Sequence, residues 1–274
     1  TEKIFGSKRF INLSKDIISY NRQYFAARKL LRRIESFNKQ DIQKYQYGQL
    51  KKLIEYAAIY VPYYRDLFKK IGFKPEMFRK IDDIQHIPYL TKDIIKANRD
   101  RLVADIFPKK YLKLTITGGT TGTPMDFYLD RRTSSPVEFA YLQYIWGRIG
   151  YRFRDRCVVL RGDDIENIVE GKVYWKKNRL LNWLLMSSLR LNEHNVHLYL
   201  EKIKEFNPEY IIAYPSMAYI LAKYAGTRNI FLPKLRGVIC SSETLYSWQR
   251  QFIKNVFGVT VFPYYGLSEK CCIA

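Results

Sequence analysis

The sequence predicts an α/β fold, in which helices pack on a mainly parallel sheet and a helical N-terminal segment precedes them. Two observations lead to this prediction. Apolar residues recur at helical spacing over the first hundred residues, and short apolar strands alternate with amphipathic helices in the last third of the chain. The chain has 274 residues, of which 47% are hydrophobic, so it can bury a sizeable core. We expect a mostly helical segment over 1–110 and an α/β region over 111–274.

The N-terminal helices are placed by apolar spacing and by their end signals. Apolar side chains repeat every three to four positions over 30–37 and again over 50–58. Pro62 ends the second pattern, since proline disfavours a helical conformation in the residue before it, and it also suits the first turn of a short helix that ends at Gly72. Thr91 is expected to cap the next helix.

From residue 111 onward, strands are predicted at 111–117, 124–129, 157–160, 210–213, 235–240 and 259–262. The first two are expected to be joined by a glycine–threonine loop. Helices are expected over 136–148, after a cap at Asn192, over 215–226, and up to Gly258, with Leu245, Trp248, Phe252 and Val256 on one face of the last helix. Ligands of such sheets bind at the carboxyl ends of the strands, so the loops there matter most.

The composition narrows the class of protein. A formal charge of +21 favours anionic partners, although solvated helix faces explain much of it. The four cysteines, Cys157, Cys240, Cys271 and Cys272, do not resemble a disulfide framework, and we interpret them as small buried hydrophobic residues of a reducing compartment. No apolar run is long enough to span a membrane, and the chain lacks an apolar signal core, so a cytoplasmic protein is expected.

Two stretches carry groups suited to a nucleotide. The first is the loop Thr117-Gly118-Gly119-Thr120-Thr121-Gly122-Thr123-Pro124. Its glycines let the backbone approach a ligand closely, and its hydroxyl and N–H donors suit a polyphosphate. The second is Tyr264-Tyr265-Gly266-Leu267-Ser268-Glu269, which follows a strand. Here an aromatic ring can stack on a purine, a hydroxyl can reach a phosphate, and a carboxylate can hold Mg²⁺.

The order of these two stretches resembles the motif pair of the adenylate-forming superfamily, T-[SG]-G-T-T-G-x-P followed by Y-G-x-[ST]-E. Within that superfamily, residues 45–274 are most similar to the phenylacetate–CoA ligase branch and its CapK-like proteins, named from capsular polysaccharide gene clusters. Supporting matches occur at 61–65, 87–92, 213–216 and 240–244. The resemblance implies that 111–274 is the nucleotide-binding region of an AMP-binding domain.

The resemblance also implies roles for single residues. Thr117, Gly118, Gly119, Thr120, Thr121, Gly122 and Thr123 would wrap the β- and γ-phosphates of ATP. Tyr265 and Gly266 would lie at the adenine ring, Ser268 at the α-phosphate, and Glu269 at Mg²⁺. Ser241, Ser242 and Glu243 would line the adenine side, and Tyr214, Pro215 and Ser216 the acyl pocket. A carboxylic acid would become acyl-AMP, and a thiol such as that of coenzyme A would take the acyl group.

Two departures from the family pattern stand out. Gly119 replaces a common serine, which removes one hydroxyl from the loop. Members of the superfamily also continue well past the Y-G-x-[ST]-E loop, where their ribose-binding aspartate and catalytic lysine lie. We therefore expect a chain cut before its C-terminal domain, with weak or no catalysis by itself.

Other interpretations remain open. The chain could be a degenerate binding or scaffold protein of a polysaccharide cluster, or a basic nucleic-acid-binding protein, although no nucleic-acid motif is present. His194 and His197 share a helical face that could hold a metal, and Asp163 and Asp164 follow a strand at the correct end of the sheet, although a polar helix start and a capped turn explain them more simply. The acid, the acceptor and the oligomeric state are not given by the sequence.

Overall fold

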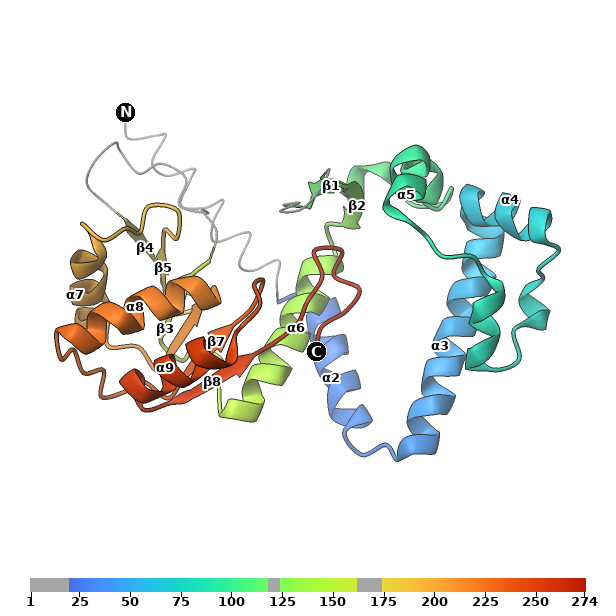
Figure 1. Cartoon of the computed structure of the whole chain (residues 1–274). Helices are drawn as coiled ribbons and strands as arrows, with labels where there is room; N and C mark the ends of the chain where they lie inside the picture. Colours follow the sequence, from blue (N-terminus) through green and yellow to red (C-terminus); the bar gives the residue numbers. More distant parts are fainter. Residues whose placement is uncertain (1–19, 118–123, 162–173) are drawn as a thin grey trace. The chain divides into compact units, whose positions relative to one another are not determined.

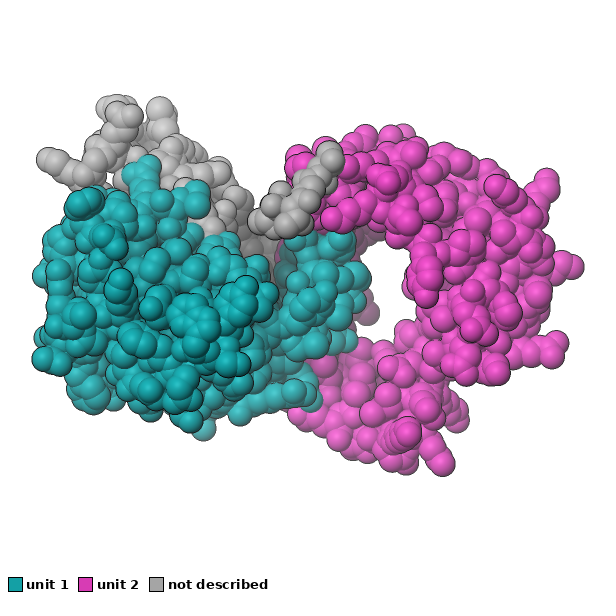
Figure 2. All heavy atoms as spheres, in the orientation of Figure 1, with its two compact units in different colours: residues 1–21, 138–274 teal, residues 22–137 magenta. Residues whose placement is uncertain are grey.

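The computed structural model describes residues 20–117, 124–161 and 174–274. The chain forms two compact units, which Figure 2 colours separately: unit 1 comprises 1–21 and 138–274, and unit 2 comprises 22–137. In the part of the chain that the structure describes, no helix is long and apolar enough to cross a membrane.

Unit 1 contains a six-stranded sheet with the strand order β4–β5–β3–β6–β7–β8 (Figure 1). The strands are β3 (Cys157–Leu160), β4 (Trp175–Asn178), β5 (Trp183–Met186), β6 (Tyr210–Ala213), β7 (Gly237–Cys240) and β8 (Thr260–Pro263). All neighbours pair in parallel except β4, which is antiparallel to β5 at one edge. The predicted α/β class with a mainly parallel sheet is confirmed.

Helices cover both faces of this sheet. In β6, Ile211 and Ala213 point to one face and Tyr210 and Ile212 to the other, and all four are buried. The first face packs against α7 (Val196–Phe206), α8 (Pro215–Thr227) and α9 (Ser247–Phe257), which lie together in Figure 1. The second face packs against the end of α6 (Ser134–Trp146) and the short 3₁₀ helix η5 (Gly147–Ile149). Burial on both faces explains why β6 and β7 are continuous apolar runs.

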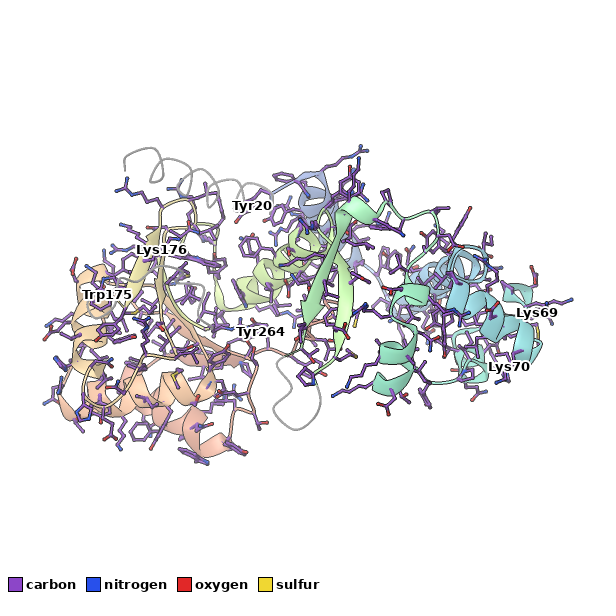
Figure 3. The ribbon with its side chains drawn as sticks, turned by 90° about the horizontal axis from the view of Figure 1, so that it is seen from above. Tyr20, Lys69, Lys70, Trp175, Lys176 and Tyr264 are labelled. Atoms are coloured by element: carbon purple, nitrogen blue, oxygen red, sulfur yellow. The ribbon has the colours of Figure 1, made fainter. Side chains whose placement is uncertain are left out.

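The edge hairpin β4–β5 was not predicted. Its inner strand is a run of four apolar residues, too short to be assigned to a strand or a helix by periodicity. Its outer strand carries Lys176 and Lys177, and Figure 3 labels Lys176 together with Trp175. Lysines on an exposed edge strand discourage pairing with another chain. On the same strand, the ring of Trp175 is covered by Lys202, whose Nζ lies 5.8 Å from the ring centre.

Unit 2 is mostly helical and ends in a hairpin. Its helices are α2 (Arg22–Ile34), α3 (Lys39–Tyr60), α4 (Pro62–Ile71) and α5 (Lys92–Asn98). Short 3₁₀ helices lie between them and the hairpin: η1 (Pro75–Met77), η2 (Ile81–His86), η3 (Asp100–Leu102) and η4 (Lys109–Tyr111). The hairpin pairs β1 (Leu112–Ile116) with β2 (Asp126–Asp130) in antiparallel register. The small core of unit 2 contains Ile54, Phe68, Phe73 and Phe78.

The predicted helix ends in unit 2 are confirmed. Helix α3 ends at Tyr60, and Pro62 occupies the first turn of α4. Gly72 closes α4 in the left-handed region at φ 66°, where a side chain would be strained. Thr91 Oγ1 accepts a hydrogen bond from the N–H of Ile94 (3.3 Å) and caps α5.

The predicted boundary at residue 110, placed where helical spacing gives way to strand alternation, stays a prediction. By density of contacts, the β1–β2 hairpin groups with the preceding helices, because it pairs within itself and lies outside the six-stranded sheet. Arg99 of unit 2 binds Asp126 of β2 and lies over the ring of Tyr128, which ties the hairpin to α5 and η3.

The predicted cap at Asn192 is confirmed by its hydrogen bonds. The Asn192 Oδ1 accepts from the N–H groups of His194 (2.9 Å) and Asn195 (3.2 Å), and the carbonyl of Asn192 accepts from the N–H of Val196 (3.0 Å). The regular part of α7 begins one turn later, at Val196, and Asn195, which directly precedes it, makes no side-chain cap of its own.

The helix at α9 and its closure by Gly258 are confirmed, but the face predicted from spacing is only partly buried. Leu245 and Val256 pack against the core, whereas Trp248 is 57% exposed. The centre of the buried face is formed by Ile253, which is fully buried, and by Gln249, which was overlooked because it is polar.

Truncation of α9 should distinguish these two faces. We expect Ile253→Ala to lower the free energy of unfolding by about 2–5 kcal/mol, because it leaves a cavity in the core. The matched change Trp248→Ala removes a larger but exposed side chain and should cost less than about 1 kcal/mol. Urea unfolding followed by circular dichroism measures both, and equal losses would contradict the observed orientation of the helix.

Candidate functional site

The carboxyl ends of four strands in unit 1 lie in register. Leu160 of β3 pairs with Ala213 of β6, Ala213 with Cys240 of β7, and Cys240 with Pro263 of β8. The residues that follow these four are therefore brought to one edge of the sheet in a row: Arg161, Tyr214, Ser241 and Tyr264. We call this row, with the loops that continue from it, the carboxyl edge. Ligands of parallel α/β sheets bind at this end of the strands.

The loop after β7 is strained. Ser242 has φ 70°, a left-handed conformation that a serine rarely adopts. Ser241 is buried, and its hydroxyl lies 3.5 Å from that of Ser242. Such conformations cost energy and persist where the surroundings hold them, often at ligand sites. Ser241 and Ser242 were both expected to line the adenine side of a nucleotide pocket.

Glu243 binds the first turn of α8. Its Oε2 accepts a hydrogen bond from the N–H of Ser216, and its Oε1 accepts one from the hydroxyl of Ser216, both at 3.0 Å. Helix α8 begins with Pro215 and lacks a side-chain cap from Tyr214, so Glu243 satisfies one of the N–H groups that every helix start leaves free. Glu243 and Ser216, predicted on the adenine and acyl sides respectively, are thus in contact.

Arg161 was not singled out from the sequence, and it lies at the centre of the contacts along this edge. Its Nη1 donates a hydrogen bond to the hydroxyl of Tyr264, and its Nη2 donates to Ser242 Oγ (2.9 Å). The guanidinium carbon lies 5.7 Å from the centre of the Tyr264 ring. The one signal that could have identified Arg161 is its position directly after a buried strand.

The segment after Tyr264, which Figure 3 labels, folds into a hairpin. Tyr265 and Ala274 exchange two backbone hydrogen bonds of 2.7 and 2.9 Å, and Leu267 N–H donates to the carbonyl of Cys272 (3.2 Å). The hairpin turns at Ser268, which is exposed, and closes with Lys270 at φ 59°. The ring of Tyr265 is 58% exposed and free to stack on a planar ligand.

Two neighbouring residues of this hairpin differ in their partners. Lys270 Nζ forms an ion pair with Glu138 Oε2 of α6 at 2.8 Å, and both side chains are mostly buried. The half-buried carboxylate of Glu269 forms no ion pair with any residue that the structure describes. Glu269 therefore keeps oxygen atoms with which a cation could bind.

The threonine loop, residues 117–124, belongs to unit 2, and the structure describes only its two ends, Thr117 and Pro124. The N–H of Thr117 donates to the carbonyl of Met125, and the N–H of Met125 donates to Thr117 Oγ1, both at 2.9 Å. The predicted phosphate residues Gly118, Gly119, Thr120, Thr121, Gly122 and Thr123 lie outside the described residues. Asp163 and Asp164 also lie outside them.

The cysteines divide into buried and exposed pairs. Burial raises the pKa of the Cys240 thiol to about 12, and Glu243 acts in the same direction while Arg161 opposes it. Burial also raises the pKa of Cys157 well above its ordinary value. Cys271 and Cys272 are exposed, which corrects the expectation that all four are buried, and they lie in the terminal hairpin.

Across the described ranges, no three His, Cys, Asp or Glu residues, His194 and His197 included, form a metal-binding group.

Comparisons with known proteins agree on one family of relatives. The chain is 28% identical over 253 residues to Protein CapK of Staphylococcus aureus, a match that covers 85% of this chain and 55% of CapK. It is 29% identical over 247 residues to phenylacetate–coenzyme A ligase of Escherichia coli K12 (86% and 53%) and 26% identical over 254 residues to that of Pseudomonas putida (91% and 56%). The chain thus spans about half the length of the curated relatives it matches, and no protein-family model matches it.

The fold is similar to that of another CoA ligase. A 2-hydroxyisobutyryl-CoA ligase, solved in an open conformation with 2-HIB-AMP and CoA, superposes with a TM-score of 0.64 at 17% identity, over 85% of this chain and 55% of the ligase. The same ligase in its thioesterification state gives 0.63. The resemblance to the phenylacetate–CoA ligase and CapK branch is confirmed, and the fold of the chain is that of an adenylate-forming ligase. The roles of single residues stay predictions.

The contact between Glu243 and Ser216 should contribute measurably to stability. We expect Glu243→Ala to lower the free energy of unfolding by about 1 kcal/mol, because it leaves the start of α8 uncapped. Glu243→Gln keeps one carbonyl acceptor and should lose less. Urea unfolding of the single variants, of Ser216→Ala and of the double variant Glu243→Ala/Ser216→Ala forms a cycle, and additive losses would contradict a direct contact.

The thiols should react in two classes. With a pKa of about 12, about one Cys240 thiol in ten thousand is ionised at pH 8, and only the thiolate attacks. The sign follows from burial, which raises the pKa and so keeps the thiol protonated until strongly alkaline pH. We expect 5,5′-dithiobis(2-nitrobenzoic acid) to titrate Cys271 and Cys272 in the reduced folded protein and all four thiols in guanidinium. Rapid reaction of a third thiol before unfolding would contradict the burial.

Proposed function

We propose that this chain, similar to CapK and phenylacetate–CoA ligases over most of its length, provides the nucleotide-binding part of an ATP-dependent ligase that activates a carboxylic acid. The carboxylate oxygen would attack the α-phosphorus of ATP, the bond to pyrophosphate would break, and acyl-AMP would form. A thiol, for which coenzyme A is our first candidate, would then attack the acyl carbon and release AMP. We place the reaction in the cytoplasm.

The observation that carries this proposal is the alignment at the carboxyl edge. The strained Ser241–Ser242 loop and the Tyr264–Glu269 segment follow adjacent strands whose ends are in register at Cys240 and Pro263. Two stretches that are distant in sequence, and that match the family on independent motifs, therefore emerge side by side. This is the arrangement that a ligand contacted by both loops requires.

The chemical properties of each side chain suit its proposed role. The exposed ring of Tyr265 offers a flat surface to adenine, and its backbone is fixed by pairing with Ala274. The exposed hydroxyl of Ser268 is proposed to contact the α-phosphate. The hydroxyl of Thr117 accepts a hydrogen bond from the N–H of Met125 at the base of the threonine loop. We therefore propose that the β- and γ-phosphates bind mainly to the loop residues after Thr117.

Glu269 fits the requirements of a Mg²⁺ ligand. Mg²⁺ in nucleotide sites is held by one or two carboxylates, by phosphate oxygens and by water, so the lack of a multi-residue metal cluster among the described residues is compatible with it. Bound Mg²⁺ would neutralise charge that develops on the phosphates. The ammonium group of Lys270 is paired with Glu138 and therefore does not compete with Mg²⁺ for the adjacent carboxylate of Glu269.

A thermal-shift titration tests the nucleotide site. ATP with Mg²⁺ should raise the melting temperature of the chain by several degrees at saturating concentration, and GTP with Mg²⁺ should raise it less, because a ligand that binds only the folded state stabilises it by mass action. Tyr265→Ala and Glu269→Ala should reduce the ATP shift. Tyr246→Ala is the matched control, since Tyr246 is 56% exposed and lies at the start of α9.

The outcomes separate the open interpretations. A shift that is selective for ATP and lost in both site variants supports the ligase and justifies screening acids. If neither this chain nor a version extended to the length of its relatives responds to ATP, the proposal is wrong and a scaffold protein becomes the better interpretation. A shift produced equally by ATP and by an arbitrary DNA duplex, and removed by salt, would favour nonspecific binding of polyanions.

A further inference from the structure

Arg161 occupies the position in the sheet where ligands are most often bound. After β3, the chain adds β4 and β5 on one side, then crosses β3 to add β6 on the other side. The order of the strands therefore reverses between β3 and β6, and the crevice outside such a reversal is the usual binding position in open α/β sheets. Arg161 is the first residue after β3, and Tyr214 is the first after β6.

The guanidinium of Arg161 is oriented by neutral groups. Its two terminal nitrogens donate to the hydroxyls of Tyr264 and Ser242, which follow β8 and β7. Its third nitrogen, Nε, is buried and has no hydrogen-bond acceptor among the residues that the structure describes. Two of the five N–H donors are thus used to fix the plane of the group, and the second N–H of each terminal nitrogen is left for a ligand.

The positive charge of Arg161 is not balanced by an acid in the described part of the chain. No carboxylate of the described residues lies within ion-pair distance of it, whereas Arg236, also in unit 1, has both Asp155 and Glu209 within 3.7 Å. The sequence between Glu209 and Glu269 contains a single acid, Glu243, and its two oxygens are bound by Ser216. Among the described residues the half-buried guanidinium has only hydroxyl partners, and such a charge is costly unless an anion completes its shell.

We infer that Arg161 is an anion-binding residue of the carboxyl edge, and that it takes an oxyanion of the ligand, either a phosphate or a carboxylate. The planar fork of a guanidinium matches two oxygens of either group. The inference deepens the proposed function and rests on it, because a reaction between a carboxylic acid and a nucleotide presents both oxyanions at one place.

A different role would be purely structural, with Arg161 serving to hold Tyr264 in place. Variants separate the two roles. Arg161→Gln removes the charge, and Tyr264→Phe removes one hydrogen-bond partner but leaves the charge. Arg156→Gln is the matched control, because Arg156 directly precedes β3 at its opposite end, where its guanidinium lies 4.8 Å over the ring of Phe206.

Isothermal titration calorimetry compares each anion with its neutral counterpart. AMP against adenosine tests a phosphate, and phenylacetate against phenylacetamide tests a carboxylate. We expect the unaltered chain to prefer the anion in at least one pair, and Arg161→Gln to lose about 10- to 100-fold of that preference. Arg156→Gln should keep it, and Tyr264→Phe, which removes one orienting partner but leaves the charge, should lose less of it than Arg161→Gln does. The pair that loses its preference identifies the source of the oxyanion.

Several results would overturn the inference. They are an unaltered chain with no anion preference in either pair, an Arg161→Gln variant that keeps the preference, and an equal loss in Tyr264→Phe, which would make Arg161 a support for the tyrosine. Failure of the proposed function gives a different result, because neither AMP nor adenosine then binds. In that case the comparison of phenylacetate with phenylacetamide alone tests whether Arg161 binds an anion. Circular dichroism of each variant verifies that it is folded.

Discussion

Parallel pairing in register is the constraint from which the rest of unit 1 follows. Leu160, Ala213, Cys240 and Pro263 align across four strands, and this alignment determines which side chains emerge next to one another. The pairing is held by burial on both faces, since β6 and β7 are fully buried between α7–α9 and the end of α6. A slip of one residue in any strand would turn its core side chains to the opposite face, so the register is strongly specified.

The same alignment explains what could be predicted from the sequence. The strand Tyr210–Ala213 was predicted to the residue, because a fully apolar run follows Pro208 and Glu209 and precedes Pro215. The helix ends at Gly72 and Gly258 were also predicted, since both positions have a positive φ that glycine adopts without strain. Periodicity failed at Trp183–Met186, a run of the same length without prolines nearby to mark its ends, and at Gln249, a polar residue that is buried.

The candidate site was predictable only in its separate loops. The Ser241–Ser242 loop and the Tyr264–Glu269 segment could each be found as a pattern, but their position side by side depends on the pairing of β7 with β8. Arg161 illustrates the limit: apart from its position directly after a buried strand, nothing local distinguishes it from the many other arginines of a basic chain. Its significance comes from Ser242 and Tyr264, which follow β7 and β8, and from the lack of acids over 210–242, and none of this is visible before the strands are ordered.

The contact between Glu243 and Ser216 has a consequence for how the carboxyl edge attracts ligands. A helix start carries a partial positive charge, and in many nucleotide-binding folds it is this dipole that draws a phosphate. At α8, the carboxylate of Glu243 already binds that end, and its negative charge opposes the dipole. Near α8, attraction of an anion therefore depends on the full charges of side chains. Their effect weakens with added salt, and each can be removed by a single substitution.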